Sequence, residues 1–317
     1  MDTQYVIGMD IGGTNTVFGI VDARGNVLSK SAVKTDLHDD FDLFVDDVYQ
    51  ELNVLITQVG GLSKIKGMGI GAPNGNHYTG NIEFAPNLRW KGVVPLSKLM
   101  SEKIGVPVVV TNDANAAAIG EMTYGAARGM KNFIMITLGT GVGGGVIIDG
   151  KLVYGHDGFA GELGHICSVR NGRLCGCGKY GCLETYASAS GVARTAKEIL
   201  ETQQVESLLR NIPLDNITSK DVHDAALQGD KVALDIFEYT GKVLGEALAD
   251  FVAFSAPEAF VLFGGLTKAG DYILNPIKEH MEKNLLKIWQ GKVKILFSQL
   301  KEADAAVLGA SALAWEL

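Results

Sequence analysis

One histidine and three cysteines close together in the sequence have the residue types of a zinc site. They are His165, Cys175, Cys177 and Cys182, and the segment CGCGKYGC puts glycines between the thiols, so a short loop can wrap around one ion. Three thiolates and one imidazole form a closed tetrahedral set that leaves no position for water, which is typical of structural zinc. The fourth cysteine, Cys167, is interpreted as a small buried apolar residue.

Two carboxylates flank this cluster. Glu162 precedes His165 by three residues, and Glu184 follows Cys182 by two. Zinc on one ring nitrogen of His165 would fix the ring and leave the other nitrogen to face a ligand. The alternative for each glutamate is a solvated surface position.

Asn112 and Asp113 stand where the apolar run VPVVVT ends and a helical pattern begins. Either residue can serve as a helix N-cap. The functional interpretation makes Asp113 a general base on a substrate hydroxyl, with the Asn112 amide as a ligand for that hydroxyl. Asn74, Asn76 and Asn87 add side chains of the kind that bind a polyol, although turn chemistry explains these three as well.

Two turns rich in glycine and threonine have the composition of anion-binding loops. One covers residues 12–14, and the other, GTGVGGG, begins at residue 139. Glycine permits close approach of the backbone, whose N–H groups can surround a phosphate. The second turn also satisfies G-x-G-x-x-G, but that dinucleotide fingerprint must open a helix, and here a strand follows, so we reject a nicotinamide site. A plain tight turn is the alternative for each loop alone.

Asp10 ends the first predicted strand beside the first of these loops. Its carboxylate could hold Mg²⁺ or the waters of that ion against phosphate oxygens, or it could simply cap the turn. Gly264 and Gly265 follow another buried strand, where either a nucleotide or a tight turn would explain them.

Short strands and amphipathic helices alternate along the chain and would position these residues. Tight turns predict an antiparallel meander of three strands over 4–11, 16–22 and 27–34. The next predicted elements are a helix at 41–59, a strand at 65–71, a helix at 95–104, a strand at 106–111 and a helix at 113–124. A second meander covers 133–155, followed by helices at 185–201, 218–228 and 231–255, a strand at 259–263, a helix at 267–285, a strand at 293–297 and a helix at 303–316.

The two meanders begin alike, with VIGMDIGGTNTVFGIVD in the first and FIMITLGTGVGGGVIID in the second. This similarity predicts a duplicated unit, and therefore an α/β fold of two similar lobes around a ligand-binding cleft. We expect an N-terminal lobe over 1–115, with the terminal helix at about 301–317 packing back on it. The C-terminal lobe would cover 116–300 and contain the zinc loop 165–182.

Composition excludes several classes of protein. The 317 residues carry a net charge of -8 without a basic block, which argues against nucleic-acid binding. With 47% hydrophobic and 20% charged residues the chain is not a disordered protein. It has neither a run of about 18 apolar residues nor a cationic leader, so we expect no contact with a membrane. The tight cysteine cluster favours metal ligation in the reducing cytoplasm.

Four motifs in order, DIGGT, GTGVGGG, GELGH and CGCGKYGCLE, resemble the ROK family (repressor, open reading frame, kinase). The resemblance extends from Asp10 to the terminal helix and is strongest to bacterial glucokinases. It implies the actin-like ATPase (ribonuclease H-like) fold and ATP-dependent phosphorylation of a hexose at its 6-hydroxyl, with glucose 6-phosphate as the expected product. It also implies ATP, Mg²⁺ and structural Zn²⁺ as cofactors, and a homodimer or homotetramer.

The resemblance assigns roles to matching positions. Asp113 corresponds to the catalytic base. The sugar-binding positions are Asn87, Asn112, Glu162, His165 and Glu184. The nucleotide-binding positions are Gly12, Gly13, Thr14, Thr140, Gly141 and Gly265. The zinc ligands are His165, Cys175, Cys177 and Cys182.

The segment from Pro73 to His77 departs from the family, which often has Pro-Gly and an apolar residue there, so this loop bears on sugar identity. The repressor branch has an N-terminal helix-turn-helix, which we do not expect because Met1 lies only nine residues before Asp10. Alternative substrates are fructose, allose, mannose, N-acetylmannosamine and N-acetylglucosamine. A non-catalytic sugar sensor would not need Asp113 as a base, and the closed ligand set disfavours a zinc-dependent hydrolase.

Overall fold

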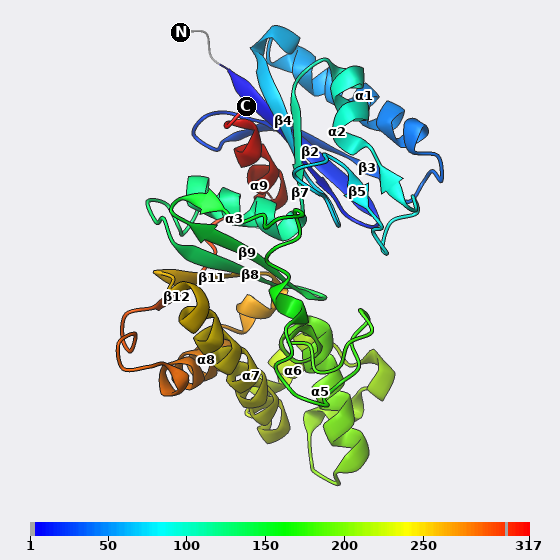
Figure 1. Ribbon diagram of the computed structural model, residues 1–317. Coiled ribbons are helices and arrows are strands. Elements are labelled where there is room, and N and C mark those ends of the chain that lie inside the picture. The colour runs from blue at the N-terminus through cyan, green and yellow to red at the C-terminus, as the bar shows by residue number, and fades with distance from the viewer. Residues whose placement is uncertain (1–3, 302–303) are drawn as a thin grey trace. The chain divides into compact units, whose positions relative to one another are not determined.

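The computed structural model describes residues 4–301 and 304–317 (Figure 1). The chain divides into two compact units. Unit 1 contains the described residues up to Met130, together with Gly145–Gly161 and Ser298–Leu317. Unit 2 contains Lys131–Gly144 and Glu162–Phe297. The chain therefore passes from one unit to the other four times.

A five-stranded mixed sheet forms the centre of unit 1. Its strands are β1 (Tyr5–Ile11), β2 (Asn15–Val21), β3 (Val27–Lys34), β4 (Ile65–Gly71) and β7 (Val108–Thr111). They lie in the order β3-β2-β1-β4-β7. The first three pair antiparallel, as the meander predicted, whereas β4 is parallel to β1 and to β7. Parallel pairing places the carboxyl ends of β1, β4 and β7 at one edge of the sheet.

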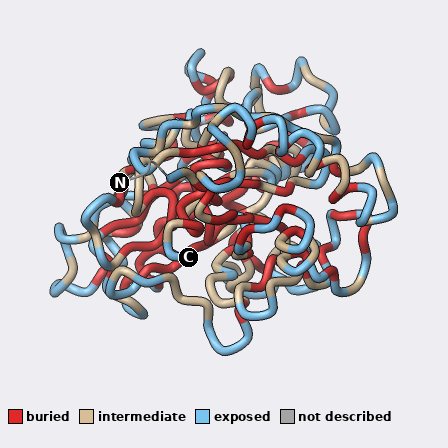
Figure 2. Tube along the Cα trace, turned by 90° about the horizontal axis from the view of Figure 1, so that it is seen from above, coloured by how far each residue is buried: buried red, intermediate tan, exposed pale blue. Residues whose placement is uncertain are grey.

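Helices cover the two faces of this sheet in different ways. On one face, α1 (Phe41–Gln58) and α2 (Leu96–Ile104) bury large side chains, among them Phe44, against Ile7 and Met9 of β1. On the other face lies α9 (Ala305–Ala314), which is rich in alanine. A Cβ at Gly8 would stand 2.0 Å from the Val307 carbonyl oxygen. Glycine at this position therefore lets the α9 backbone approach the sheet directly. Figure 2 marks the buried residues along the chain.

Unit 1 also contains α3 (Asp113–Tyr124), which packs on α9. It contains as well the two short strands β5 (Ile82–Glu83) and β6 (Val93–Val94), which pair antiparallel.

A second five-stranded sheet repeats the order of the first. Its strands are β8 (Phe133–Leu138), β9 (Val142–Ile148), β10 (Lys151–Leu152), β11 (Ala259–Phe263) and β12 (Lys294–Phe297). The order is β10-β9-β8-β11-β12, with β11 parallel to both of its neighbours. The boundary between the units falls within β9, so β10 and the end of β9 belong to unit 1, and β8, β11 and β12 belong to unit 2. Unit 2 also contains α4 (Glu184–Ala187), α5 (Ala189–Thr202), α6 (Ser219–Leu227), α7 (Lys231–Ser255) and α8 (Asp271–Asn284).

Both units contain short 3-10 helices. In unit 1 there is η1 (Leu62–Lys64), and in unit 2 there are η2 (Leu163–His165), η3 (Leu208–Asn211), η4 (Leu214–Asn216) and η5 (Gly265–Ala269).

One helix prediction was wrong: residues 185–201 form two helices, α4 and α5. The break lies at Ser188, whose backbone is extended (φ -89°, ψ 169°) and whose hydroxyl accepts a hydrogen bond from the Gly191 N–H. Ser188 thus caps a new helix, which a hydrophobic period does not reveal. The predicted terminal helix begins later, at Ala305, and residues 302–303 lie outside the described part of the chain. No helix within the described residues is both long and apolar enough to cross a membrane.

Candidate functional site

Two predicted site carboxylates of unit 1 lie at the carboxyl ends of parallel strands, Asp10 near the end of β1 and Asp113 just after β7. Asp10 is paired with Gly71 across β1 and β4, and Gly71 is paired with Thr111 across β4 and β7. Asp113 comes two residues later, at the start of α3. A Cβ at Gly71 would lie 3.3 Å from Asp10 Oδ1 and 3.7 Å from the Asp113 Cα. Gly71, which the sequence analysis missed, therefore keeps the space between the two acids open.

The Asp10 carboxyl carries an unusual proton affinity. Burial raises its pKa from 3.8 to about 7, and the negative charge of Asp113 acts in the same direction. A cation between the two acids would remove both causes, because it replaces lost hydration and offsets the repulsion. The pair thus has the donor type and the electrostatics of a site for a hard divalent cation such as Mg²⁺.

Asn112 and Asp113 form the start of α3 in the way that capping predicted. Asn112 is buried, and its Oδ1 accepts from the Asn115 N–H at 2.7 Å. Asp113 is exposed, and its Oδ1 accepts from the Ala114 N–H at 2.8 Å. One oxygen of Asp113 is therefore fixed by the helix, while the exposed carboxylate keeps the other for a ligand.

The first glycine turn joins β1 to β2 and lies beside the loop that carries Asn87. The Gly12 N–H donates to the Asn15 carbonyl at 3.0 Å. A Cβ at Gly13 would stand 3.2 Å from the Asn87 carbonyl oxygen. Thr14 and Asn87 are both exposed. Predicted nucleotide-binding and sugar-binding positions therefore adjoin one another within unit 1.

Two of the loop asparagines have turn roles. Asn74 has a left-handed backbone (φ 51°), and its amide donates to the Glu83 carbonyl at 2.9 Å. Asn76 is 3% exposed; its Oδ1 accepts from the Tyr78 N–H at 2.9 Å, and its Nδ2 donates to the Asp157 carbonyl at 2.8 Å. Local turn chemistry thus explains both, and Asn76 also fastens its loop to residues far along the chain.

Aromatic rings reinforce this long-range contact. The His77 ring stacks on Tyr154, with centroids 3.8 Å apart and planes 8° apart. Tyr78 donates its hydroxyl hydrogen to the Gly155 carbonyl at 2.9 Å. We call the contact of residues 76–78 with residues 154–157 the loop clasp. Residues 154–157 lie shortly before Gly161, after which the chain passes from unit 1 to unit 2. The loop clasp therefore holds the segment through which the chain leaves unit 1.

In unit 2, the second glycine turn and the glycine pair after β11 lie at the same sheet edge. Thr137 of β8 is paired with Phe263 of β11, so the residues that follow each strand are neighbours. A Cβ at Gly264 would stand 2.5 Å from the Leu138 carbonyl oxygen. Thr140 and Gly265 are exposed at this edge.

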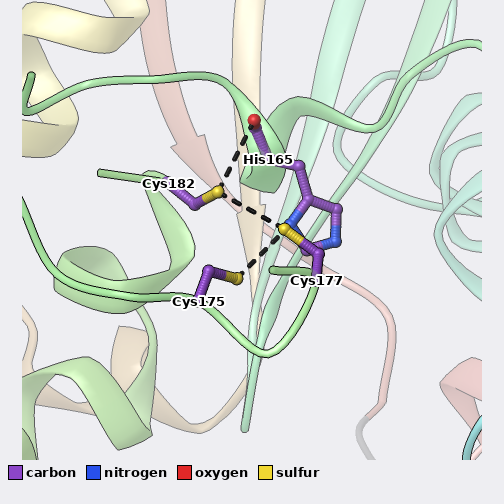
Figure 3. A group of neighbouring side chains, drawn as sticks. All are labelled: His165, Cys175, Cys177 and Cys182. Atoms are coloured by element: carbon purple, nitrogen blue, oxygen red, sulfur yellow. Dashed lines mark hydrogen bonds between the residues drawn. The ribbon is translucent and has the colours of Figure 1, made fainter. Parts of the chain in front are cut away.

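The four predicted zinc ligands converge, as Figure 3 shows. One ring nitrogen of His165 and the sulfurs of Cys175, Cys177 and Cys182 all lie within 4.8 Å of one another. Cys175 Sγ is 3.7 Å from His165 Nδ1, and Cys177 Sγ is 3.6 Å from Cys182 Sγ. All the cysteines are free thiols.

These distances fit a tetrahedral zinc ion. With Zn–S bonds of about 2.3 Å, the edge of a regular tetrahedron is about 3.8 Å, close to the separations observed. Burial raises the pKa of Cys175, and that of Cys182 to about 12. A divalent cation would compensate for the loss of these protons, since ligating thiols are deprotonated. The donor set is closed and sulfur-rich, as a structural zinc site requires.

Cys167 corrects the sequence analysis, because it is exposed and not buried. Its segment runs at the surface of the loop and is held through its backbone, where the Ser168 N–H donates to the Gly181 carbonyl at 2.9 Å. The Cys167 side chain is therefore not needed for packing.

Glu184 connects the cysteine cluster to the second glycine turn. Its Oε2 accepts from the Val142 N–H at 3.0 Å, and its Oε1 lies 3.6 Å from Cys175 Sγ. A Cβ at Gly141 would stand 2.2 Å from Glu184 Oε2, so a larger residue there would displace the Glu184 carboxylate. Glu162 is exposed just before the 3-10 helix that contains His165.

The predicted site residues thus form two groups. Unit 1 holds Asp10, Gly12, Gly13, Thr14, Asn87, Asn112 and Asp113. Unit 2 holds Thr140, Gly141, Glu162, His165, Cys175, Cys177, Cys182, Glu184 and Gly265.

Comparison with known proteins gives consistent matches over the whole length. A model of the ROK family matches residues 6–316. The chain is 40% identical to a glucokinase of Streptomyces coelicolor over 98% of this chain and 97% of that protein. It is 38% identical to a glucokinase of Halalkalibacterium halodurans, over 98% and 94% respectively. The fold is similar to the crystal structure of a ROK family glucokinase from Streptomyces griseus in complex with glucose and AMPPNP. That match has a TM-score of 0.80 and 38% identity and covers 99% of this chain and 100% of that one.

Proposed function

The chain belongs to the ROK family, and from this premise we propose that it is an ATP-dependent kinase that phosphorylates glucose to glucose 6-phosphate. The observation that carries the proposal is the exposed Asp113 carboxylate at the start of α3, beside the half-buried Asp10, in a chain similar to glucokinases throughout. Phosphoryl transfer requires mainly positioning and charge stabilisation, which a base, a cation site and anion-binding loops supply.

Asp113 is proposed as the general base. Its free oxygen would accept the proton of the sugar 6-hydroxyl as that oxygen attacks the γ-phosphate of ATP. Asn112 is fixed as the helix cap through its Oδ1, so its Nδ2 is the group left to donate to a sugar oxygen. The Asn87 loop, Glu162, His165 and Glu184 would bind the other sugar hydroxyls.

The glycine turns are proposed to bind ATP. Backbone N–H groups at Gly12, Gly13 and Thr14 and at Thr140 and Gly141 suit phosphate oxygens, and Gly265 allows close approach of the nucleotide. Asp10 would hold Mg²⁺ through its waters, and the ion would supply positive charge to the β- and γ-phosphates. We further propose that the two units are the two lobes of the actin-like fold.

Zinc is proposed to act structurally. With its Nδ1 directed at the cysteine sulfurs, His165 would keep Nε2 for a sugar hydroxyl. The ion would supply rigidity to a loop that has little regular secondary structure of its own. We also propose a cytoplasmic homodimer or homotetramer, as the resemblance implies.

The test is release of ADP from ATP and Mg²⁺ with a panel of hexoses and N-acetylhexosamines. We expect strong turnover on glucose. Turnover on another sugar of the panel would keep the mechanism and change the substrate. Glucose binding without turnover on any sugar would contradict the kinase assignment and favour a sugar sensor.

A further inference from the structure

Arg173 is a buried charge that neither the zinc site nor the proposed chemistry uses. It lies two residues before Cys175, and its side chain is only 9% exposed. Burying a guanidinium is costly unless its donors are paired. The partners of Arg173 therefore indicate what the residue does.

Each nitrogen of the guanidinium has an acceptor. Nε and Nη2 donate to Glu198 Oε2 at 3.0 and 2.6 Å, and Nη2 also donates to Thr195 Oγ1 at 2.9 Å. Nη1 donates to the carbonyls of Thr185 at 2.7 Å and Gly191 at 3.4 Å. The fork of N–H groups thus reaches both α4 and α5 across the break between them.

The main chain of Arg173 and the stacking of its guanidinium provide further contacts with α4 and with the cysteine loop. Its N–H donates to the Tyr186 hydroxyl at 2.8 Å, and its guanidinium lies 4.5 Å from the centroid of the Tyr186 ring. Its carbonyl accepts from the Gly181 N–H at 2.8 Å, within the cysteine loop. A Cβ at Gly172 would stand 2.2 Å from the Tyr186 hydroxyl oxygen, so the approach requires glycine there.

These contacts fix the position of Glu184. Glu184 is the first residue of α4, a helix of four residues that is too short to be stable by itself. Arg173 bonds to the next residue along, Thr185, and stacks on the one after it. Its backbone also supports the loop that carries Cys175. The guanidinium therefore fixes the helix whose first side chain contacts both Cys175 and the Val142 N–H.

We propose that Arg173 is a positioning residue that holds Glu184 and the cysteine loop in the geometry that binds the sugar. The inference rests on the proposed function insofar as Glu184 is a sugar ligand. Arg173 itself would touch neither sugar nor zinc. Its effect would pass through Thr185 and Tyr186 to Glu184.

Arg194 provides a matched control. It also binds Glu198, at 2.8 Å, and a loop carbonyl, that of Leu174, at 3.1 Å. Its side chain is 42% exposed, and these two hydrogen bonds tie it to α5 and the loop rather than to α4. Arg173→Met and Arg194→Met remove the same charge from the same carboxylate, but only the first releases α4.

The experiment measures glucose affinity by calorimetry and zinc transfer to a colorimetric chelator, on the full chain. We expect Arg173→Met to weaken glucose binding about tenfold and to speed zinc release about tenfold, and Arg194→Met to change each less than about twofold. In a Glu184→Gln background, Arg173→Met should weaken glucose binding by less than about twofold. If Arg173→Met does not fold, Arg173→Lys replaces it, with a smaller effect in the same direction.

Two results would overturn the proposal. One is zinc release from Arg173→Met at the wild-type rate. The other is that Arg173→Met weakens glucose binding by the same factor in the Glu184→Gln background as in the wild type. That result would indicate a general structural role for Arg173. Wild-type protein that binds glucose without phosphorylating it would contradict the proposed function and leave this inference standing, because neither readout requires turnover.

Discussion

The two groups of site residues are built by different means. In unit 1, Asp10 lies near the end of β1, Asp113 begins α3, and a helix cap fixes Asn112, so the backbone of regular elements places each side chain. In unit 2, His165 and the cysteines lie in a loop with only isolated bridges and short turns among its described residues. There, side-chain contacts, together with the proposed zinc ion, would position the residues that a sheet edge positions in unit 1. We therefore expect unit 1 to tolerate changes that disable unit 2.

The largest effect should come from the chemical step itself. Asp113→Asn keeps the helix cap but cannot accept a proton, so we expect kcat to fall by about 10²-fold or more while glucose affinity stays near that of the wild type. Steady-state kinetics measures kcat, and calorimetry measures glucose affinity. Glu102→Gln, at an exposed position of α2, is the control. Near-normal turnover would remove Asp113 as the base.

Loss of one proposed zinc ligand should affect unit 2 more than unit 1. Cys177→Ser should weaken zinc binding about 10–100-fold and lower both thermal stability and glucose affinity, because His165 and Glu184 lose their frame. Metal analysis after dialysis against a chelator checks this, and Cys167→Ser is the control, since it removes an exposed thiol outside the cluster. Wild-type stability and glucose affinity in zinc-free Cys177→Ser would show that the ion does not organise unit 2.

Asp10 should make the stability of unit 1 depend on pH near neutrality. The folded pKa of about 7 exceeds 3.8, so the folded state binds the proton more tightly than the unfolded state. The stability that the folded state gains from protonated Asp10 is complete below about pH 4 and is lost as the pH rises through 7. Without Mg²⁺ at pH 8, Asp10→Asn should raise the free energy of unfolding by about 2 kcal/mol, and the gain should shrink towards pH 5.

Urea denaturation between pH 5 and 8 measures this difference. Added Mg²⁺ and ATP should stabilise the wild type more than Asp10→Asn. A difference between the two proteins that does not vary with pH would contradict the shifted pKa.

The smallest expected effect concerns the loop clasp. His77→Ala removes the stacking on Tyr154 and should lower stability by about 1 kcal/mol, whereas His77→Phe keeps a ring and should stay close to the wild type. Thermal denaturation of the two variants tests this. Equal stability of both would mean that the hydrogen bonds of Asn76 and Tyr78 hold the clasp without the rings.

The sequence by itself determined the local elements and the family. Strand β4, helix α3 and helix α7 have the predicted bounds, because hydrophobic period and capping residues act over a few positions. The four predicted zinc ligands lie close together in the chain, and the structure confirms that their ligand atoms converge. The family assignment from four motifs was confirmed by the match over residues 6–316.

Tertiary structure decided what depends on residues distant in the chain. Gly71 separates two acids that lie on other segments, Asn76 binds a carbonyl 81 residues away, and Arg173 joins a loop to two helices. None of these contacts leaves a periodic signal, because each is specified by packing rather than by neighbours in sequence. The exposure of Cys167 and the break at Ser188 were misjudged for the same reason. Composition and period predict an average environment, whereas each of these residues responds to one particular contact.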